Sequence, residues 1–261
     1  MSIYLERKDG LATLVFDNPE KMNILGWDEV GVLNRLTQEI ADDRSIRVIV
    51  IRAEGKVFGA GGDIGSLHPG DTALPQAILE MGAQLNRALL RLYNSPAIVV
   101  TAVQGAVAGG SIGAMNVADL VIAAKGTRFN MGYANIGASP DAGSTWFMPR
   151  LVGARKASDW LLLSDNFDAD TALAAGLITQ VVPPEQLRDV TDKLAARLLH
   201  GPRETYAHIK KLLHQADTAS LKQQLDDEIE ACADVVASGD FAEGVAAFMA
   251  KRPARFGRSG K

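Results

Sequence analysis

Two glycine-rich segments constrain the fold of this chain more than any other feature of its sequence. The first runs from Gly55 to Ile64 and the second from Gly105 to Ser111, and each follows an apolar run that predicts a buried strand. Glycine lets the backbone turn tightly, and the first N–H groups of a helix have no partner inside that helix. Two such turns on adjacent strands could aim two backbone donors at one oxygen atom, which is an oxyanion hole. Tight packing of helices on a sheet, with no ligand, explains the same glycines, and the residues alone leave both interpretations open.

Strands and helices alternate along the first part of the chain. Alternating residues predict a hairpin of strands at 3–7 and 11–16, and apolar runs predict buried strands at 47–53, 97–103 and 120–124. Helical spacing predicts helices at 27–41, 77–93, 111–117, 143–152 and 154–163. Almost everything from Asp170 onward is predicted to be helical, over ranges 171–175, 184–200, 203–214, 220–237 and 240–251. This order predicts an α/β fold, divided into a core of residues 1–200 and a C-terminal helical region of residues 201–261.

The composition excludes several classes of protein. Of the 261 residues 47% are hydrophobic, which is enough for a large core and excludes disordered and coiled-coil classes. The formal net charge of −4 argues against a nucleic-acid partner. A single cysteine supplies neither an internal disulfide nor a cysteine-based zinc cluster, and no HExxH or GxSxG motif is present. We therefore expect neither a metal nor a cofactor.

No segment predicts contact with a membrane. Residues 1–9 have no basic start and no apolar run, so no secretory signal is predicted and the cytoplasm is the expected location. The most apolar stretch, residues 97–124, contains Gln104, Asn116, Asp119 and four glycines. Burying those polar groups in a bilayer would cost on the order of several kcal/mol each. A buried strand, a glycine-rich turn and a short helix account for this stretch better.

Several segments, in their order along the chain, resemble motifs of the crotonase (enoyl-CoA hydratase/isomerase) superfamily. The two glycine-rich turns resemble its AGAD-type and NGxAxGGG-type turns, the second written here as QGAVAGGS from Gln104. Residues 18–23, NPEKMN, resemble its NP-x-K-x-N segment, and residues 168–182 resemble its DAxxAxxxGLV stretch. Residues 244–252 resemble its terminal helix. The resemblance therefore covers nearly the whole chain.

This resemblance implies a fold, a substrate and a set of site residues. The fold would be the crotonase/ClpP-like spiral of ββα units, with residues 201–261 joining chains into a homotrimer, or a hexamer that is a dimer of trimers. The substrate would be an acyl-CoA thioester, so that coenzyme A enters as part of the substrate rather than as a cofactor. By their positions in the motifs, Gly62 and Gly110 would donate their N–H groups to the thioester oxygen. The remaining contacts would come from Lys21, Met22, Ala60 and Ile64, and from Phe248 and Lys251 of a neighbouring subunit.

Two departures from the family pattern bear on the reaction. Hydratases of this family use two glutamates, and the corresponding positions here are Gly113 and Tyr133. A hydratase needs one carboxylate to take a proton from water and another to handle the proton on the α-carbon. The chain is therefore not predicted to be a conventional hydratase. Tyr133 is expected to donate a hydrogen bond to the substrate or to form a wall of its pocket.

Asp141 supplies a different carboxylate. Its segment SPDAGST, residues 139–145, resembles that of enoyl-CoA isomerases with a single catalytic aspartate, such as the ring-1,2-epoxyphenylacetyl-CoA isomerases of aromatic degradation. There one aspartate removes a proton from one acyl carbon and returns it to another, so we predict an isomerase of fatty acid or aromatic degradation. From the residues alone, Asp141 could instead cap the helix that follows it. The family also leaves open a hydratase, an aryl-CoA dehalogenase with Asp141 as nucleophile, a thioester hydrolase, a ring-cleaving enzyme and an inactive acyl-CoA binder.

Overall fold

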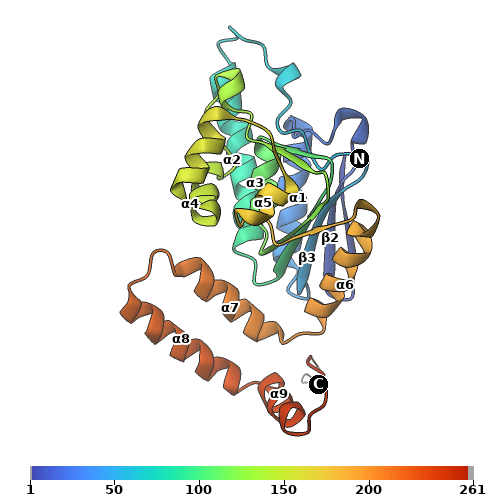
Figure 1. Cartoon of the computed structure of the whole chain (residues 1–261), viewed down its shortest axis with the longest axis vertical. Coiled ribbons are helices and arrows are strands. Elements are labelled where there is room, and N and C mark those ends of the chain that lie inside the picture. Colours follow the sequence, from blue (N-terminus) through green and yellow to red (C-terminus); the bar gives the residue numbers. More distant parts are fainter. Residues whose placement is uncertain (1, 258–261) are drawn as a thin grey trace.

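The computed structural model describes residues 2–257, and a six-stranded sheet forms its centre (Figure 1). The strands lie in the order β1-β2-β3-β4-β6-β9. The edge strand β1 runs antiparallel to β2, and the other neighbouring pairs are parallel. Their bounds are β1 (Ile3–Lys8), β2 (Leu11–Phe16), β3 (Val48–Ala53), β4 (Ile98–Val103), β6 (Leu120–Ala124) and β9 (Gln180–Val182).

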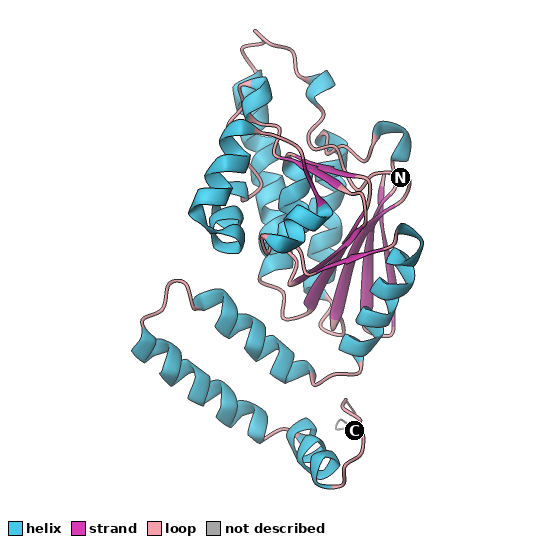
Figure 2. Cartoon of the chain, in the orientation of Figure 1, coloured by secondary structure: helices cyan, strands magenta, loops and turns pink. Residues whose placement is uncertain are grey.

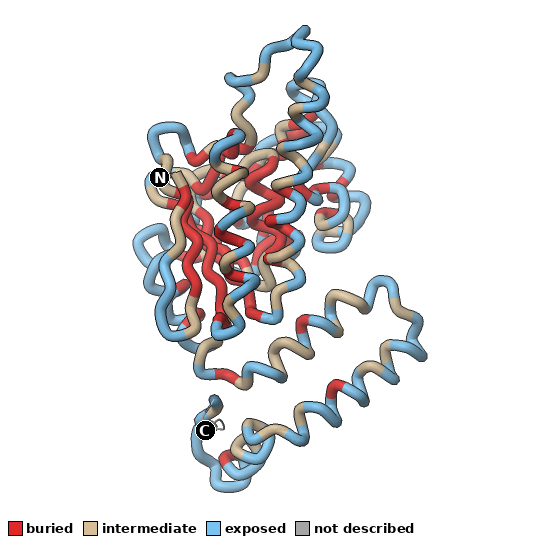
Figure 3. Tube along the Cα trace, turned by 180° about the vertical axis from the view of Figure 1, so that it is seen from behind, coloured by how far each residue is buried: buried red, intermediate tan, exposed pale blue. Residues whose placement is uncertain are grey.

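Helices cover both faces of this sheet. β3 and β4 are buried along their whole length, which explains their continuous apolar sequences. The helices α1 (Trp27–Asp42) and α2 (Leu74–Tyr93) pack on one face, in a large cluster that includes Leu33 and Leu89. On the other face α6 (Leu187–Leu199) packs Ala195 against a smaller cluster of valines. Figure 3 shows the buried residues gathered along the strands and the helices beside them.

A second, small sheet and three further helices lie above the carboxyl ends of the main strands. The small sheet has the order β5-β7-β8, with β5 (Ala106–Ala108), β7 (Arg128–Asn130) and β8 (Phe167–Asp168). The helices are α3 (Gly110–Asn116), α4 (Ser144–Leu163) and α5 (Ala169–Ala174), and Gly153 breaks α4 with a non-helical backbone, where two helices were predicted. Four single turns of 3-10 helix complete the list: η1 (Pro19–Lys21), η2 (Ile64–Ser66), η3 (Ala134–Ile136) and η4 (Pro184–Gln186). Within residues 2–257, no helix is both long enough and apolar enough to cross a bilayer.

The predicted elements of the main sheet and the long helices are found, with two kinds of error. Strands of two or three residues are too short for a periodic pattern, so β5, β7 and β8 were not predicted. The expectation that almost everything after Asp170 is helical is wrong at β9, which adds an edge strand to the main sheet. α2 also begins at Leu74 rather than residue 77, because Pro75 fits the first turn of a helix.

Three C-terminal helices form an arm that extends away from the sheet (Figure 2). They are α7 (Arg203–Gln215), α8 (Leu221–Val236) and α9 (Gly239–Met249). The buried Lys210 joins the arm to the core, because its Nζ donates to Asp119 Oδ2 at 2.9 Å and to the Ala97 carbonyl at 3.1 Å. Large apolar side chains are exposed on α8 and α9, among them Ile229, Phe248 and Met249. The arm falls in the predicted helical region 201–261, of which residues 258–261 lie outside the described residues.

Candidate active site

The two glycine-rich turns lie side by side, as the sequence predicted. The Gly59 N–H donates to the Ala106 carbonyl at 3.2 Å, and the Ala108 N–H donates back to the Gly59 carbonyl at 2.9 Å. This short parallel pairing continues the contact of β3 with β4 beyond the main sheet. The ends of both turns are thereby brought to one place, next to the start of α3.

Glycine is required at the contact between the turns. A Cβ on Gly59 would overlap the Ser111 side chain, and a Cβ on Gly61 would lie 3.0 Å from the Ala108 carbonyl oxygen. Gly61 also has φ of +91°, which side chains disfavour. The Ser111 hydroxyl accepts a hydrogen bond from the Gly61 N–H at 3.1 Å. The close approach of two backbones therefore depends on the absence of side chains.

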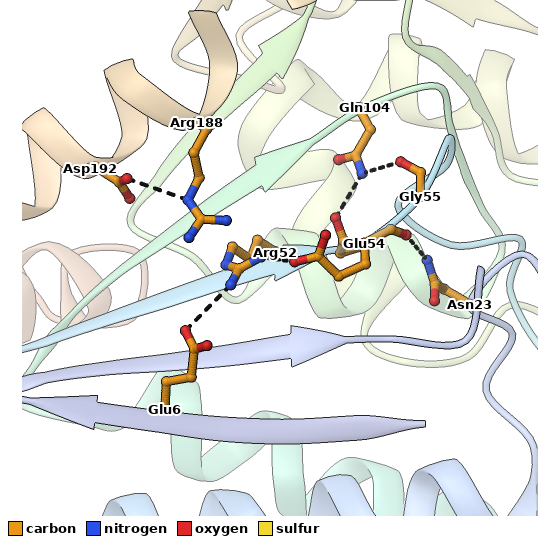
Figure 4. Close-up of polar contacts among 9 residues, drawn as sticks. Glu6, Asn23, Arg52, Glu54, Gly55, Gln104, Arg188 and Asp192 are labelled. Carbon is orange, nitrogen blue, oxygen red and sulfur yellow. Dashed lines mark hydrogen bonds and ion pairs between the residues drawn. The ribbon is translucent and has the colours of Figure 1, made fainter. Parts of the chain in front are cut away.

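Asn23 and Gln104 hold the base of the first turn from its two sides (Figure 4). The Asn23 Nδ2 donates to the carbonyls of Glu54 and Val57 at 3.0 and 2.9 Å. The Gln104 Nε2 donates to the carbonyls of Ala53 and Gly55 at 2.9 and 3.1 Å. Both amides lie in segments that resemble family motifs, but this role depends on contacts between segments far apart in the chain, which local sequence does not predict.

The N–H groups of Gly62 and Gly110 are free at the junction of the two turns. Gly110 is the first residue of α3, so its N–H has no partner within the helix. Between residues 2 and 257, neither N–H donates a hydrogen bond to another group of the chain. Both are available to a ligand, as an oxyanion hole requires.

Asp141 lies beside the second turn. A Cβ placed on Gly110 would be 3.6 Å from its Oδ1. The hydroxyl of the buried Tyr133 donates to the same oxygen at 2.7 Å and lies 3.3 Å from Ser144 Oγ, a neighbour that was not predicted from the sequence. Asp141 as a residue is exposed in the single chain. The structure thus brings Gly110, Tyr133 and Asp141 together from three separate segments.

The alternative that Asp141 caps a helix is wrong. α4 begins at Ser144 with Gly143 as its N-cap, and no side chain caps it. The segment between Asp141 and the helix turns through two left-handed residues, Ala142 with φ of 49° and Gly143 with φ of 76°. This backbone turns the carboxylate toward Tyr133 instead of the free N–H groups of α4.

Gly113 stands at the position of the first hydratase glutamate. The segment that carries Asp141 fills the space that a side chain there would need. A Cβ on Gly113 would overlap the carbonyl oxygen and the Cβ of Ala142 and would lie 3.0 Å from the carbonyl carbon of Ala142. Only glycine fits there while this segment keeps its conformation. The second hydratase position is Tyr133, whose hydroxyl is bound to Asp141.

Tyr133 is a hydrogen-bond donor at neutral pH. Burial raises the pKa of its phenol, and the negative charge of Asp141 raises that pKa further. The hydroxyl therefore keeps its proton and donates it to the carboxylate. The two roles expected for Tyr133, forming a wall of the pocket and donating a hydrogen bond to the substrate, stay predictions, and the partner of its hydroxyl in the described chain is Asp141.

The residues predicted to contact the rest of the substrate fall into two groups. Lys21, Met22, Ala60 and Ile64 lie around the first turn, where the Ala60 N–H donates to the Met22 carbonyl at 3.0 Å. Met22 and Ile64 are large apolar residues that are about half exposed, at 54% and 51%. Phe248 and Lys251 lie in or just after α9, in the arm and away from α3, which lies inside the core (Figure 1). Within one chain the structure does not bring this second group to the site.

Known proteins resemble this chain in sequence and in fold. The enoyl-CoA hydratase/isomerase family profile matches residues 6–259. The 1,2-epoxyphenylacetyl-CoA isomerase of Escherichia coli is 33% identical over 95% of each chain, and the trans-2-decenoyl-[acyl-carrier-protein] isomerase of Streptococcus mutans is 30% identical over 95% of each. An enoyl-CoA hydratase crystal structure from Polaromonas sp. JS666 has a TM-score of 0.90 and 28% identity, covering 97% of this chain and 98% of that one. The predicted crotonase fold is confirmed, and the chain belongs to the enoyl-CoA hydratase/isomerase family.

Proposed function

We propose that this protein is an enoyl-CoA isomerase, which moves a carbon–carbon double bond along the acyl chain of a coenzyme A thioester. The observation that carries the proposal is the position of the Asp141 carboxylate. It lies beside Gly110, the first residue of α3, and is held there by the Tyr133 hydroxyl at 2.7 Å. A base next to an oxyanion hole is the arrangement that proton transfer through an enolate requires.

In the proposed reaction the thioester carbonyl oxygen accepts hydrogen bonds from the N–H groups of Gly62 and Gly110. Asp141 removes a proton from one carbon of the enoyl chain, and the electron pair of the broken C–H bond moves into the conjugated system. The negative charge collects on the thioester oxygen, where the two N–H donors stabilise it. The protonated Asp141 then returns the proton to a different carbon. The double bond has moved, and the composition of the substrate is unchanged.

The same residues favour isomerisation over hydration. Neither hydratase glutamate is present, because Gly113 and Tyr133 stand at those positions. The space at Gly113 is filled by Ala142, and Tyr133 is bound to Asp141. A single carboxylate can move one proton between two carbons, whereas hydration also needs a group that activates water.

We also propose that the working form is a homotrimer, or a hexamer built from two trimers. The arm supports this proposal because it exposes large apolar side chains such as Phe248, which is 82% exposed. In such an assembly Phe248 and Lys251 would reach the coenzyme A of a neighbouring subunit, beside that subunit's Lys21 and Met22. Light scattering at micromolar concentration tests the oligomer, and a monomer would contradict it.

Isotope exchange tests the proposed reaction. We expect the protein, incubated in heavy water with aliphatic and cyclic enoyl-CoA thioesters, to place deuterium on the α- or γ-carbon of its substrate. The product should be an isomer that has gained no water. Mass spectrometry reports both results. Rapid accumulation of a hydrated product, with no shift of the double bond, would contradict the isomerase proposal.

Tyr133→Phe removes one hydroxyl and should lower kcat about tenfold, because the carboxylate loses its hydrogen-bond donor. KM should change little, since the backbone donors are intact.

The raised pKa of Tyr133 also makes the free energy of unfolding depend on pH. The contribution of the protonated phenol to that free energy is fully present below about pH 10 and is lost as the pH rises through the folded-state pKa. The wild-type free energy of unfolding should therefore fall more steeply above about pH 10 than that of the variant. Denaturant titrations at several pH values measure this, with Tyr206→Phe in the arm as control. Equal slopes for wild type and Tyr133→Phe would contradict it.

A further inference from the structure

A cleft lies on the face of the main sheet opposite to Tyr133. It has a volume of about 490 Å³ and opens between the carboxyl ends of β3, β4 and β6 and the start of α6. Small residues, Ala102, Ala124 and Gly126, leave the space open. α6 packs in the smaller hydrophobic cluster, whereas Tyr133 belongs to the larger one on the opposite face. The cleft therefore lies on the other face of the sheet from Tyr133, although Gly55, Lys56, Gln104 and Gly105 at the bases of the two turns also line it.

Positive charge dominates this cleft. Four cationic side chains line it, from Arg52, Lys56, Lys125 and Arg188, against the single carboxylate of Glu54. Lys56 and Lys125 take part in no ion pair with the residues between 2 and 257. The protein as a whole has a net charge of −4, so this concentration of positive charge runs against its overall balance. Such a local field favours a multiply charged anion.

Arg52 supplies a buried donor that the chain leaves unused. Arg52 is 8% exposed. It lies within β3, a buried parallel strand, and such strands normally carry apolar side chains. Its guanidinium contacts Glu54 and, at 3.3 Å, Glu6 (Figure 4). Its Nε has no hydrogen-bond partner among residues 2–257. A buried N–H without a partner is unfavourable, and because this nitrogen is shielded from solvent, Arg52 adds its positive charge to the wall of the cleft and no open donor.

Arg188 faces Arg52 from the opposite wall. Figure 4 shows its side chain reaching from α6 toward Arg52, with Nε bound to Asp192 at 3.3 Å. Its terminal nitrogens lie toward the cleft. Two guanidinium groups that face each other repel, and an anion between them turns that repulsion into two attractions.

We propose that this cleft binds a small phosphate ester. The phosphoryl oxygens would lie between Arg52 and Arg188 and would accept hydrogen bonds from the terminal nitrogens of Arg188, because the planar fork of a guanidinium matches phosphate oxygens in pairs. Lys56 and Lys125 would balance the remaining charge. The organic part of the ester would lie over Ala102 and Leu187, since the cleft is larger than a phosphate group alone.

Calorimetry with phenyl phosphate tests the site on the full-length protein. The wild type should bind phenyl phosphate more tightly than benzoate, which carries one charge, and should not bind phenol. Arg188→Ala and Lys125→Ala, both at exposed positions, should each weaken phenyl phosphate binding about tenfold. Lys193→Ala is the matched control, because it removes one cation from the same helix outside the cleft. All three variants should keep the wild-type turnover of enoyl-CoA.

Binding of phosphate in this cleft must also be distinguished from binding in the acyl-CoA site, because coenzyme A carries phosphate groups of its own. Coenzyme A is expected not to displace phenyl phosphate from the protein. The Tyr133→Phe variant is expected to bind phenyl phosphate with the wild-type affinity. Displacement by coenzyme A, or equal binding by the wild type and Arg188→Ala, would place the phosphate in the acyl-CoA site and overturn the proposal. No binding by the wild type would overturn it as well.

Discussion

Replacing Asp141 by asparagine is expected to lower the kcat of isomerisation by about 10²–10⁴-fold, the usual contribution of a positioned general base. Asparagine keeps the size of the side chain and an oxygen that can accept the hydrogen bond of Tyr133. It cannot take a proton from carbon. KM should stay near the wild-type value, because the thioester oxygen is bound by backbone N–H groups. Initial rates with enoyl-CoA, together with deuterium exchange, measure the loss.

Asp159→Asn is the matched control for this substitution. Asp159 lies on α4, pairs with Lys156 at 3.0 Å and is far from the turns in sequence. Its replacement makes the same chemical change and should leave the rate unaltered. If a folded Asp141→Asn variant exchanged deuterium at the wild-type rate, Asp141 would not be the base. A loss of both exchange and thermal stability would instead indicate a structural role.

Gly110→Pro is expected to lower kcat by about 10²–10³-fold, the cost of losing one donor of an oxyanion hole. Gly110 is the first residue of α3, the position at which a helix accepts proline without losing an internal hydrogen bond. Proline therefore removes the proposed donor while leaving the hydrogen bonds of the helix intact. The same rates and exchange experiments measure the effect, with circular dichroism to verify that the variant is folded.

Gly110→Ala separates the donor from the added bulk. A Cβ at this position would meet Asp141 Oδ1 at 3.6 Å, an ordinary contact, and alanine keeps its N–H. We expect this variant to retain most of the wild-type activity. Equal losses in the alanine and proline variants would show that bulk, and not the missing N–H, disturbs the site.

Much of the architecture of the site could be predicted from the sequence. Each glycine-rich turn follows a continuous apolar run, and such runs are typical of parallel strands buried on both faces. Parallel neighbours end at the same edge of a sheet, so the prediction that the turns meet needed only the adjacency of β3 and β4. The parallel pairing of Gly59 with Val107 confirms it. The order of the long helices could also be predicted, because the helical period of apolar residues can be recognised from local sequence alone.

The details that adjust the chemistry could not be predicted in this way. The hydrogen bond from Tyr133 to Asp141 depends on η3 and on the left-handed Gly137 that ends it, and no periodic pattern encodes them. The hydrogen bonds by which Asn23 and Gln104 hold the first turn join segments that are far apart in the sequence. Arg52 in β3 breaks an apolar run, but only the structure shows that it faces a cleft. Local sequence predicts elements, whereas these features arise from how the elements meet.

The contact of Gly113 with Ala142 makes two sets of catalytic groups mutually exclusive in space. A glutamate at position 113 and the Asp141 segment in its present conformation would need the same volume. A chain of this shape therefore cannot gain the hydratase glutamate by one substitution and keep its aspartate in place. We expect strong epistasis: Gly113→Glu alone should lose isomerisation without gaining hydration, and hydration should require the segment around Asp141 to be rebuilt as well. The family's two chemistries would then be separated by a step in which several residues change together.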